Sequence, residues 1–521
     1  MSGLAGLFGG ATAATLRGLA RPLDARGPGA RWEGVHAGAG FAVVRSGSAE
    51  DGPAVAVVHG RLVAVSGHAL NRLALAREFS LPDEAGVADV YGEIVNFVGP
   101  ERGAARLAGC LSFACWDPEA RYAFLQRDAS GLRGLEVAGS PHGFAFATEG
   151  RALALAGYAG ERDLSAVAEA VRCGSPASGA SYWRGVERIP AGGTWARMGG
   201  ADPVRSAPSA VAAHPSGAAG NTERWLRSVR YGLELAAVGR VRAAGPTAIA
   251  LSDGLASAAL LGCRAPGAAP ELALVLDDGS APAAEARASA AGLRVRRVAV
   301  SGGAFAELLD ELPASFTMLH PEAWLWAALA RAAWVEGATG MLAGCGASLG
   351  FDPPPTGLRA GALAVLGRPL HESAPPPGAP LPNDAPSGPL DAFSVVTEVH
   401  LAAFDAGAAA FGVTPIAPFA DAAVLRVARQ VPVGVHHGGG RRALLAAVVA
   451  AGGVEAKAGA PRFPVLPLAE WVEHLDLDGL PVALRDQLDS EHVRAVVARA
   501  RGGDPAYLRR AFAYGILARV G

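Results

Sequence analysis

A short polar turn between two apolar runs is the part of this sequence with the most direct chemistry. Residues 247–251 read as a buried strand, a Gly/Ser turn follows, and a helical pattern begins at Ala258. The backbone amides of such a turn and the N-terminus of the next helix converge on one point, which is how many folds bind phosphate. The sequence therefore predicts a phosphate-binding loop made of Ser252, Asp253, Gly254, Leu255 and Ser257.

Composition limits the classes of protein to which the chain can belong. Its 521 residues suffice for two or three domains, and 51% of them are hydrophobic, which is typical of a folded protein. The net charge of −2 provides no excess of positive charge that would attract nucleic acid or an anionic membrane. The five cysteines are scattered, and neither a signal peptide nor a membrane helix is apparent. We therefore expect a soluble, cytoplasmic protein with reduced thiols.

The pattern of apolar residues changes once along the chain. Residues 1–205 show short alternating strands with helices at 69–79 and 87–98, which predicts an α+β domain. Residues 206–221 read as a linker. Residues 222–521 alternate strands with long helices, which predicts an α/β domain with a parallel sheet and a ligand at the carboxyl ends of its strands. We expect its helices at 222–239, 281–292 and 321–337, and a proline-rich excursion at 352–390.

The N-terminus resembles the Met-Cys-Gly-Ile-Ala-Gly-Phe opening of N-terminal-nucleophile (Ntn) glutaminases, with Ser2 in place of the cysteine. Further matches follow in the order of that family, at Arg26-Gly27-Pro28, Ser66-Gly67, Gly109 to Asp117, Arg127-Asp128 and Phe144 to Glu149. The resemblance implies an Ntn hydrolase-like sandwich. Those enzymes lose Met1, so that the α-amine of the second residue serves as base. A serine in that place is a weaker nucleophile than a thiol.

Other catalytic features of the glutaminases are also altered. Ser66 stands where the resemblance implies an oxyanion-hole asparagine. Loss of one such hydrogen-bond donor typically lowers the catalytic rate by a factor of about 10²–10³. Asp89 falls near the acid that holds the amino group of glutamine in that family. We interpret Cys110 and Cys115 as core residues and not as substitute nucleophiles. The first domain is thus expected to lack glutaminase activity.

The loop at 252–257 resembles the Ser-Gly-Gly-Leu-Asp-Ser pyrophosphate (PP) loop of the asparagine synthetase family, but Ala256 replaces its metal-binding aspartate. Residues 344–351 resemble that family's Gly-Glu-Gly-Ala-Asp-Glu-Leu-Phe, and Ser348 replaces the second aspartate. The resemblance adds Gly344, Gly346 and Ser348 to the predicted binding site. It implies ATP and Mg²⁺ as cofactors. Mg²⁺ usually needs carboxylate ligands, and both aspartates that would supply them are replaced. We therefore predict no metal ligand in this chain.

Three further features bear on this predicted site. Residues 405–421 keep the packing residues of a third motif of the family and lose its charged ones. Arg442 and Lys457, the sole lysine, lie near positions where the resemblance implies cations that contact pyrophosphate, with Lys457 catalytic. Lys457 could equally be a solvated surface residue. Asp253 could replace a metal ligand, but an acid in this loop is more apt to repel phosphate. His436-His437 reads as a loop pair.

These observations leave three functional hypotheses. The first is a degenerate asparagine synthetase homologue that acts as a binding, scaffold or regulatory subunit beside a partner synthetase or biosynthetic enzyme. The second is a divergent ATP-dependent enzyme that adenylates a carboxylate and forms an amide, as the related β-lactam synthetases and lasso peptide cyclases do without a glutaminase cysteine. The third is amidohydrolysis by Ser2 alone.

Overall fold

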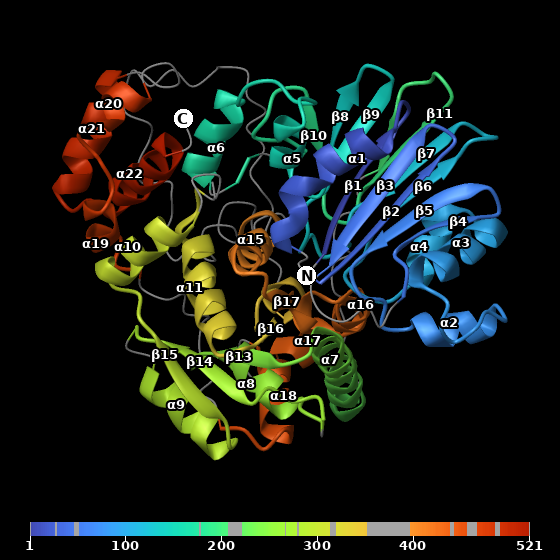
Figure 1. The fold of residues 1–521 in the computed structure, drawn as a ribbon. Coiled ribbons are helices and arrows are strands. Elements are labelled where there is room, and N and C mark those ends of the chain that lie inside the picture. The colour runs from blue at the N-terminus through green and yellow to red at the C-terminus, as the bar shows by residue number, and fades with distance from the viewer. Residues whose placement is uncertain are drawn as a thin grey trace.

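The computed structural model contains two antiparallel sheets and one parallel sheet (Figure 1). It describes residues 2–26, 29–45, 52–173, 175–176, 179–206, 221–265, 267–278, 281–312, 319–351, 396–437, 442–455, 466–484 and 490–519. Residues 2–206 are called the N-terminal part below, and residues 221–519 the C-terminal part. The prediction of antiparallel strands in the N-terminal part and of a parallel sheet in the C-terminal part is confirmed. The predicted excursion at 352–390 and most of the predicted linker lie outside the described residues.

The N-terminal part is built from two six-stranded antiparallel sheets. The first has the order β10-β8-β9-β1-β3-β2, from Ser2–Phe8 (β1), Ala30–His36 (β2), Ala39–Arg45 (β3), Glu136–Ser140 (β8), Gly143–Ala147 (β9) and Val186–Arg188 (β10). The second has the order β12-β11-β7-β6-β5-β4, from Val55–Val58 (β4), Arg61–Ser66 (β5), Ser112–Asp117 (β6), Tyr122–Gln126 (β7), Thr194–Met198 (β11) and Val204–Ser206 (β12).

Strand β1 is buried on both faces. Leu4 and Phe8 point into the core between the two sheets, where the rings of Phe8 and Phe41 lie 5.4 Å apart. Ala5 and Leu7 point the other way and pack against helices. This explains why the first residues of the chain form an almost continuous apolar run instead of alternating.

Helices cover the outer faces of both sheets (Figure 1). The helices of the N-terminal part are Ala13–Ala20 (α1), Arg21–Arg26 (η1), Arg72–Glu78 (α2), Val87–Val98 (α3), Pro100–Arg106 (α4), Gly150–Leu155 (α5) and Leu164–Cys173 (α6). Helices α1 and α5 pack on the first sheet, and α3 packs on the second. The result is a helix–sheet–sheet–helix arrangement with its main core between the sheets.

The C-terminal part is organised around a five-stranded parallel sheet of order β15-β14-β13-β16-β17. Its strands are Thr247–Leu251 (β13), Leu272–Leu276 (β14), Arg294–Val298 (β15), Gly340–Leu342 (β16) and Thr414–Ile416 (β17). Ile249 and Leu251 of β13 pack on one face with α7, α8 and α18, while Ala248 packs on the other with α11 and α15. Burial on both faces accounts for the continuous apolar character of β13.

The helices of the C-terminal part are Thr222–Ala244 (α7), Leu255–Gly262 (α8), Ala281–Ala290 (α9), Gly302–Glu311 (α10), Pro321–Val335 (α11), Ser348–Phe351 (α12), Val396–Leu401 (η3), Ala402–Ala410 (α15), Pro418–Ala420 (η4), Ala422–Gln430 (α16), Val433–His437 (α17), Ala443–Ala451 (α18), Leu468–Glu473 (α19), Leu480–Ala483 (α20), Ser490–Arg501 (α21) and Pro505–Ala518 (α22). Among the helices within the described ranges, none is both long enough and apolar enough to cross a bilayer.

Two local expectations were wrong. Helix α8 begins at Leu255 and not at Ala258, because Gly254 in an extended conformation caps it and the buried Leu255 anchors its first turn. His436 lies in helix α17, where the sequence indicated a loop. Its ring is buried, and its Nε2 lies 2.9 Å from the carbonyl oxygen of Ala428. His436 is therefore a core residue.

A buried carboxylate joins the two parts of the chain. Glu398, in η3, accepts a hydrogen bond of 2.7 Å from Arg127 and lies 3.4 Å from Arg188, and both arginines belong to the N-terminal part. Burial opposes ionisation of Glu398, but the charges of the two arginines outweigh it and lower the pKa of Glu398 below its usual range. The pair is nearly inaccessible to water and is scarcely screened by salt.

Replacing Glu398 by alanine should destabilise the whole chain, because the buried guanidinium of Arg127 loses its carboxylate and that of Arg188 keeps only Glu136. Removal of one partner of a buried ion pair typically costs about 3–5 kcal/mol. Urea unfolding of Glu398→Ala, compared with the unaltered chain, measures this loss. Asp83→Ala is the matched control, since Asp83 pairs with Arg77 on the surface at 2.8 Å and its loss should be undetectable. Equal effects of the two variants would contradict this account.

Candidate functional site

Ser2, the predicted nucleophile, is fully buried at the start of β1, with 0% of its surface exposed. The hydroxyl of Ser66, the last residue of β5, donates a hydrogen bond of 2.9 Å to the Ser2 hydroxyl. The predicted oxyanion-hole position thus contacts the predicted nucleophile directly. In the sequence Ser2 follows Met1, so its nitrogen can act as an amine base only after removal of Met1.

A buried arginine lies beside Ser2. Arg45 is the β3 partner of Ser2 in the antiparallel register, and its Nη2 donates to the carbonyl oxygen of Gly67 at 2.7 Å. Its guanidinium also lies over the ring of Trp32, 5.0 Å from the ring centre. The contact with Gly67 holds the backbone that follows Ser66.

Arg26, next to this region in η1, is held by carboxylates of the chain itself. It forms an ion pair with Glu149 and a second one, of 2.7 Å, with Asp405 of the C-terminal part. Burial tends to lower the pKa of Arg26, yet the two acids hold it above its ordinary value. An arginine in such a place is suited to binding a substrate carboxylate. Here Asp405 and Glu149 already occupy it.

The remaining candidates of the N-terminal part have structural roles. Asp89 accepts a hydrogen bond of 2.9 Å from the Gly86 amide and so caps helix α3. Burial raises the pKa of Cys110 to about 11 and that of Cys115 to about 12, so both remain unreactive thiols. The prediction that these two cysteines are core residues is confirmed.

In the C-terminal part, the predicted phosphate loop is held together by its own serines. Ser257, in the first turn of α8, has its hydroxyl 3.2 Å from the Ser252 amide and 3.1 Å from the Ser252 hydroxyl. The Gly254 amide donates to the Ser252 hydroxyl at 3.2 Å. The loop connects the carboxyl end of β13 to α8, the position that the sequence indicated. Asp253 and Leu255 complete it.

The second predicted loop lies directly against the first. It follows β16, the neighbour of β13, and a side chain placed on Gly344 would lie only 2.7 Å from the methyl group of Ala256. Gly346 adopts the left-handed region, with φ of +87°, where glycine is favoured. The two loops are 90 residues apart in sequence (from 254 to 344) and in contact in space.

Arg442 also reaches this place. It immediately precedes α18, and its Nη2 donates to the Ser348 hydroxyl at 3.1 Å. Only 5% of its surface is exposed, and its φ of +61° is uncommon for a residue other than glycine. The structure thus brings the loop at 252–257, Ser348 and Arg442 together. Lys457 lies outside the described residues.

Sequence reasoning missed Arg287, on α9. Its Nη1 donates to the Ser252 carbonyl oxygen and its Nε to that of Glu455, each at 2.9 Å. Burial lowers the pKa of Arg287, while the nearby charge of Asp253 raises it. Arg287 is the only basic residue of the helix predicted at 281–292, which is the one signal that could have pointed to it.

A buried acid–imidazole pair beside the second loop was also missed. His400 Nδ1 is hydrogen-bonded to Glu322, and Trp326 donates to the same carboxyl group at 3.1 Å. Burial opposes ionisation of Glu322, but the neighbouring His400 lowers its pKa. Burial and the charge of Glu322 raise the pKa of Cys345 well above its ordinary value. In the sequence, Glu322 reads as an ordinary acid at a helix N-terminus, with Pro321 before it.

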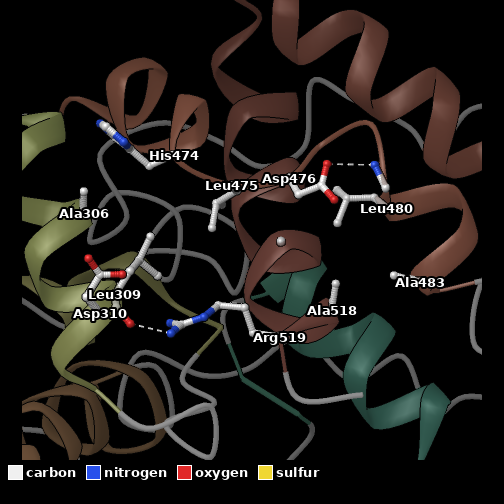
Figure 2. A pocket seen from close by; sticks show the side chains of 12 residues that line it. Ala306, Leu309, Asp310, His474, Leu475, Asp476, Leu480, Ala483, Ala518 and Arg519 are labelled. Atoms are coloured by element: carbon white, nitrogen blue, oxygen red, sulfur yellow. Dashed lines mark hydrogen bonds between the residues drawn. The ribbon is translucent and has the colours of Figure 1, made fainter.

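A separate cavity of about 490 Å³ lies between α10 and the C-terminal helices (Figure 2). Asp310, His474, Asp476 and Arg519 are the polar side chains of its lining. Arg519 donates to the Leu309 carbonyl oxygen and Asp476 accepts from the Gly479 amide, so both are engaged within the chain. Among the predicted site residues that the structure describes, none lines this cavity.

Comparisons with known proteins bear on the N-terminal part. Residues 1–203 match the family model described as a glutamine amidotransferase domain. No curated protein matches the chain. A glutamine phosphoribosylpyrophosphate amidotransferase from B. subtilis, complexed with ADP and GMP, is similar at 12% identity and a TM-score of 0.30, over 57% of this chain and 65% of that chain. A structure described as the allosteric regulatory enzyme of purine biosynthesis gives the same values.

Both of these alignments span less than two thirds of the solved structures. The family model, in contrast, covers the sandwich from β1 to the end of β11. Residues 1–203 are therefore a glutamine amidotransferase-like domain.

Proposed function

We propose that this chain is a degenerate asparagine synthetase homologue that works as a binding, scaffold or regulatory subunit in the cytoplasm. Its C-terminal part would be a PP-loop domain, and its partner an active synthetase or another enzyme of a cluster that makes a modified peptide or amino acid. The glutamine amidotransferase-like character of residues 1–203 supports the first half of this assignment.

One observation carries the proposed loss of glutaminase chemistry. Asp405, from the C-terminal part, and Glu149 both pair with Arg26, so the charge of this buried arginine is compensated inside the chain. A substrate carboxylate would have to displace the buried Asp405 and the partly exposed Glu149 from Arg26. The absence of a thiol at position 2 adds to this obstacle.

Restoring the cysteine alone should not restore glutamine hydrolysis. In Ser2→Cys the two acids still occupy Arg26, so we expect no glutamate release above that of Ser2→Ala. Coupled measurement of glutamate from glutamine checks this result, after mass spectrometry has confirmed that Met1 is removed. If instead the unaltered chain releases glutamate or ammonia and Ser2→Ala does not, the amidohydrolase hypothesis replaces this proposal.

A second candidate function rests on the pair formed by Glu322 and His400. A buried carboxylate bonded to an imidazole, beside the loop at 344–348, has the composition of a general acid–base device. This supports the alternative of a divergent, ATP-dependent synthetase that joins an adenylated carboxylate to an amine. The missing aspartates at positions 256 and 348 weigh against it.

Pyrophosphate exchange into ATP distinguishes these two functions. With Mg²⁺ and a panel of amino acids, we expect no exchange by the unaltered chain, because adenylation needs the missing metal ligands. Exchange that falls by about 10²–10⁴ in Glu322→Gln would establish the synthetase and overturn the proposal. Glu307→Gln, at an exposed ion pair with Arg331, is the matched control for this substitution.

A further inference from the structure

Helix α7 carries two large apolar side chains on the face that points away from the core. Tyr231 and Leu235 are one helical turn apart, and their exposed fractions are 63% and 54%. The opposite face packs on the core of the C-terminal part through Val229, Leu233 and Val241, each at most 5% exposed. The helix lies at the periphery of the C-terminal part (Figure 1). Tyr231 and Leu235 are therefore accessible to another molecule.

Three exposed arginines, Arg224, Arg227 and Arg242, flank this apolar pair on the same face of the helix. Within the described residues, the ion pairs of α7 involve Arg230 and Arg240 instead. The three exposed arginines thus keep their charge available to a partner. The outer face of α7 is the name used below for Arg224, Arg227, Tyr231, Leu235 and Arg242.

A second copy of the chain is a poor occupant of this face. In a two-fold contact between antiparallel helices, Tyr231 would meet Leu235, and Arg224 would then meet Arg242, since each arginine lies seven residues outside the apolar pair. Like charges that face each other oppose association. Glu223, in the first turn, is the only exposed acid of α7, so the helix retains an excess of positive charge.

We propose that the outer face of α7 is a docking surface for an amphipathic helix of a partner protein, which has apolar side chains at its centre and carboxylates towards both ends. Arg224 and Arg242 are roughly 27 Å apart at the helical rise of about 1.5 Å per residue, so each can meet a carboxylate beyond the apolar contact. Tyrosine and arginine are enriched where protein interfaces bind most strongly. The inference rests on the proposed role as a subunit beside a partner enzyme, and it names the surface that this role would use.

Two synthetic helical peptides of about 20 residues, long enough to span both arginines, test the inference on the full chain. Each carries a stripe of leucines, flanked by glutamates in the acidic peptide and by lysines in the basic one. We expect fluorescence anisotropy to show binding of the acidic peptide alone, weakened about tenfold or more in Leu235→Glu. Leu155→Glu, at an exposed leucine of α5, is the matched control and should bind as the unaltered chain does. Absence of binding, equal binding of the basic peptide, or unchanged affinity in Leu235→Glu would each overturn the inference.

A charge reversal tests the role of the arginines separately. The double variant Arg224→Glu/Arg242→Glu changes only exposed side chains, so we expect it to keep its thermal transition, to lose the acidic peptide and to bind the basic one. A retained preference for the acidic peptide contradicts the inference.

Two further measurements exclude other occupants of this face. Light scattering that shows a dimer, dissociated by Leu235→Glu, would assign the face to a second copy. Sedimentation with phosphatidylglycerol vesicles that Leu235→Glu abolishes would assign it to an anionic membrane. Either result overturns the inference. Because all these experiments measure association, their failure is distinct from the appearance of pyrophosphate exchange, which would refute the proposed function.

Discussion

Buried contacts between arginine and carboxylate groups hold the two parts of this chain together, and the rest of the structure depends on them. Glu398 pairs with Arg127 and Arg188, and Asp405 pairs with Arg26. Loss of its partner by a buried ion costs far more free energy than the same loss by an exposed ion. Separation of the two parts at this surface would therefore be strongly unfavourable. The sandwich and the parallel sheet are therefore parts of one unit. A fragment cut between them would take the carboxylate of Glu398 from Arg127 and would leave Arg188 and Arg26 with only Glu136 and Glu149 as ion-pair partners.

The same contacts bear on the proposed loss of glutaminase chemistry. Catalysis requires charged groups that remain available to a ligand, and such groups lower the stability of the folded protein. In the Ser2 region the conflict is resolved in favour of stability, since Arg26 is neutralised by Glu149 and Asp405.

Much of this arrangement could be read from the sequence, and the reason is periodicity. The apolar run at 247–251 and the turn after it predicted the loop between β13 and α8. The second loop, at 344–348, was predicted from its resemblance to a family motif and not from periodicity. The contacts of Arg287, Glu322 and His400 could not be read in this way. Each contact joins elements that are far apart in the chain, so no periodic pattern in the sequence indicates it. The start of α8 was missed because burial of Leu255 outweighed the turn character of the serines around it.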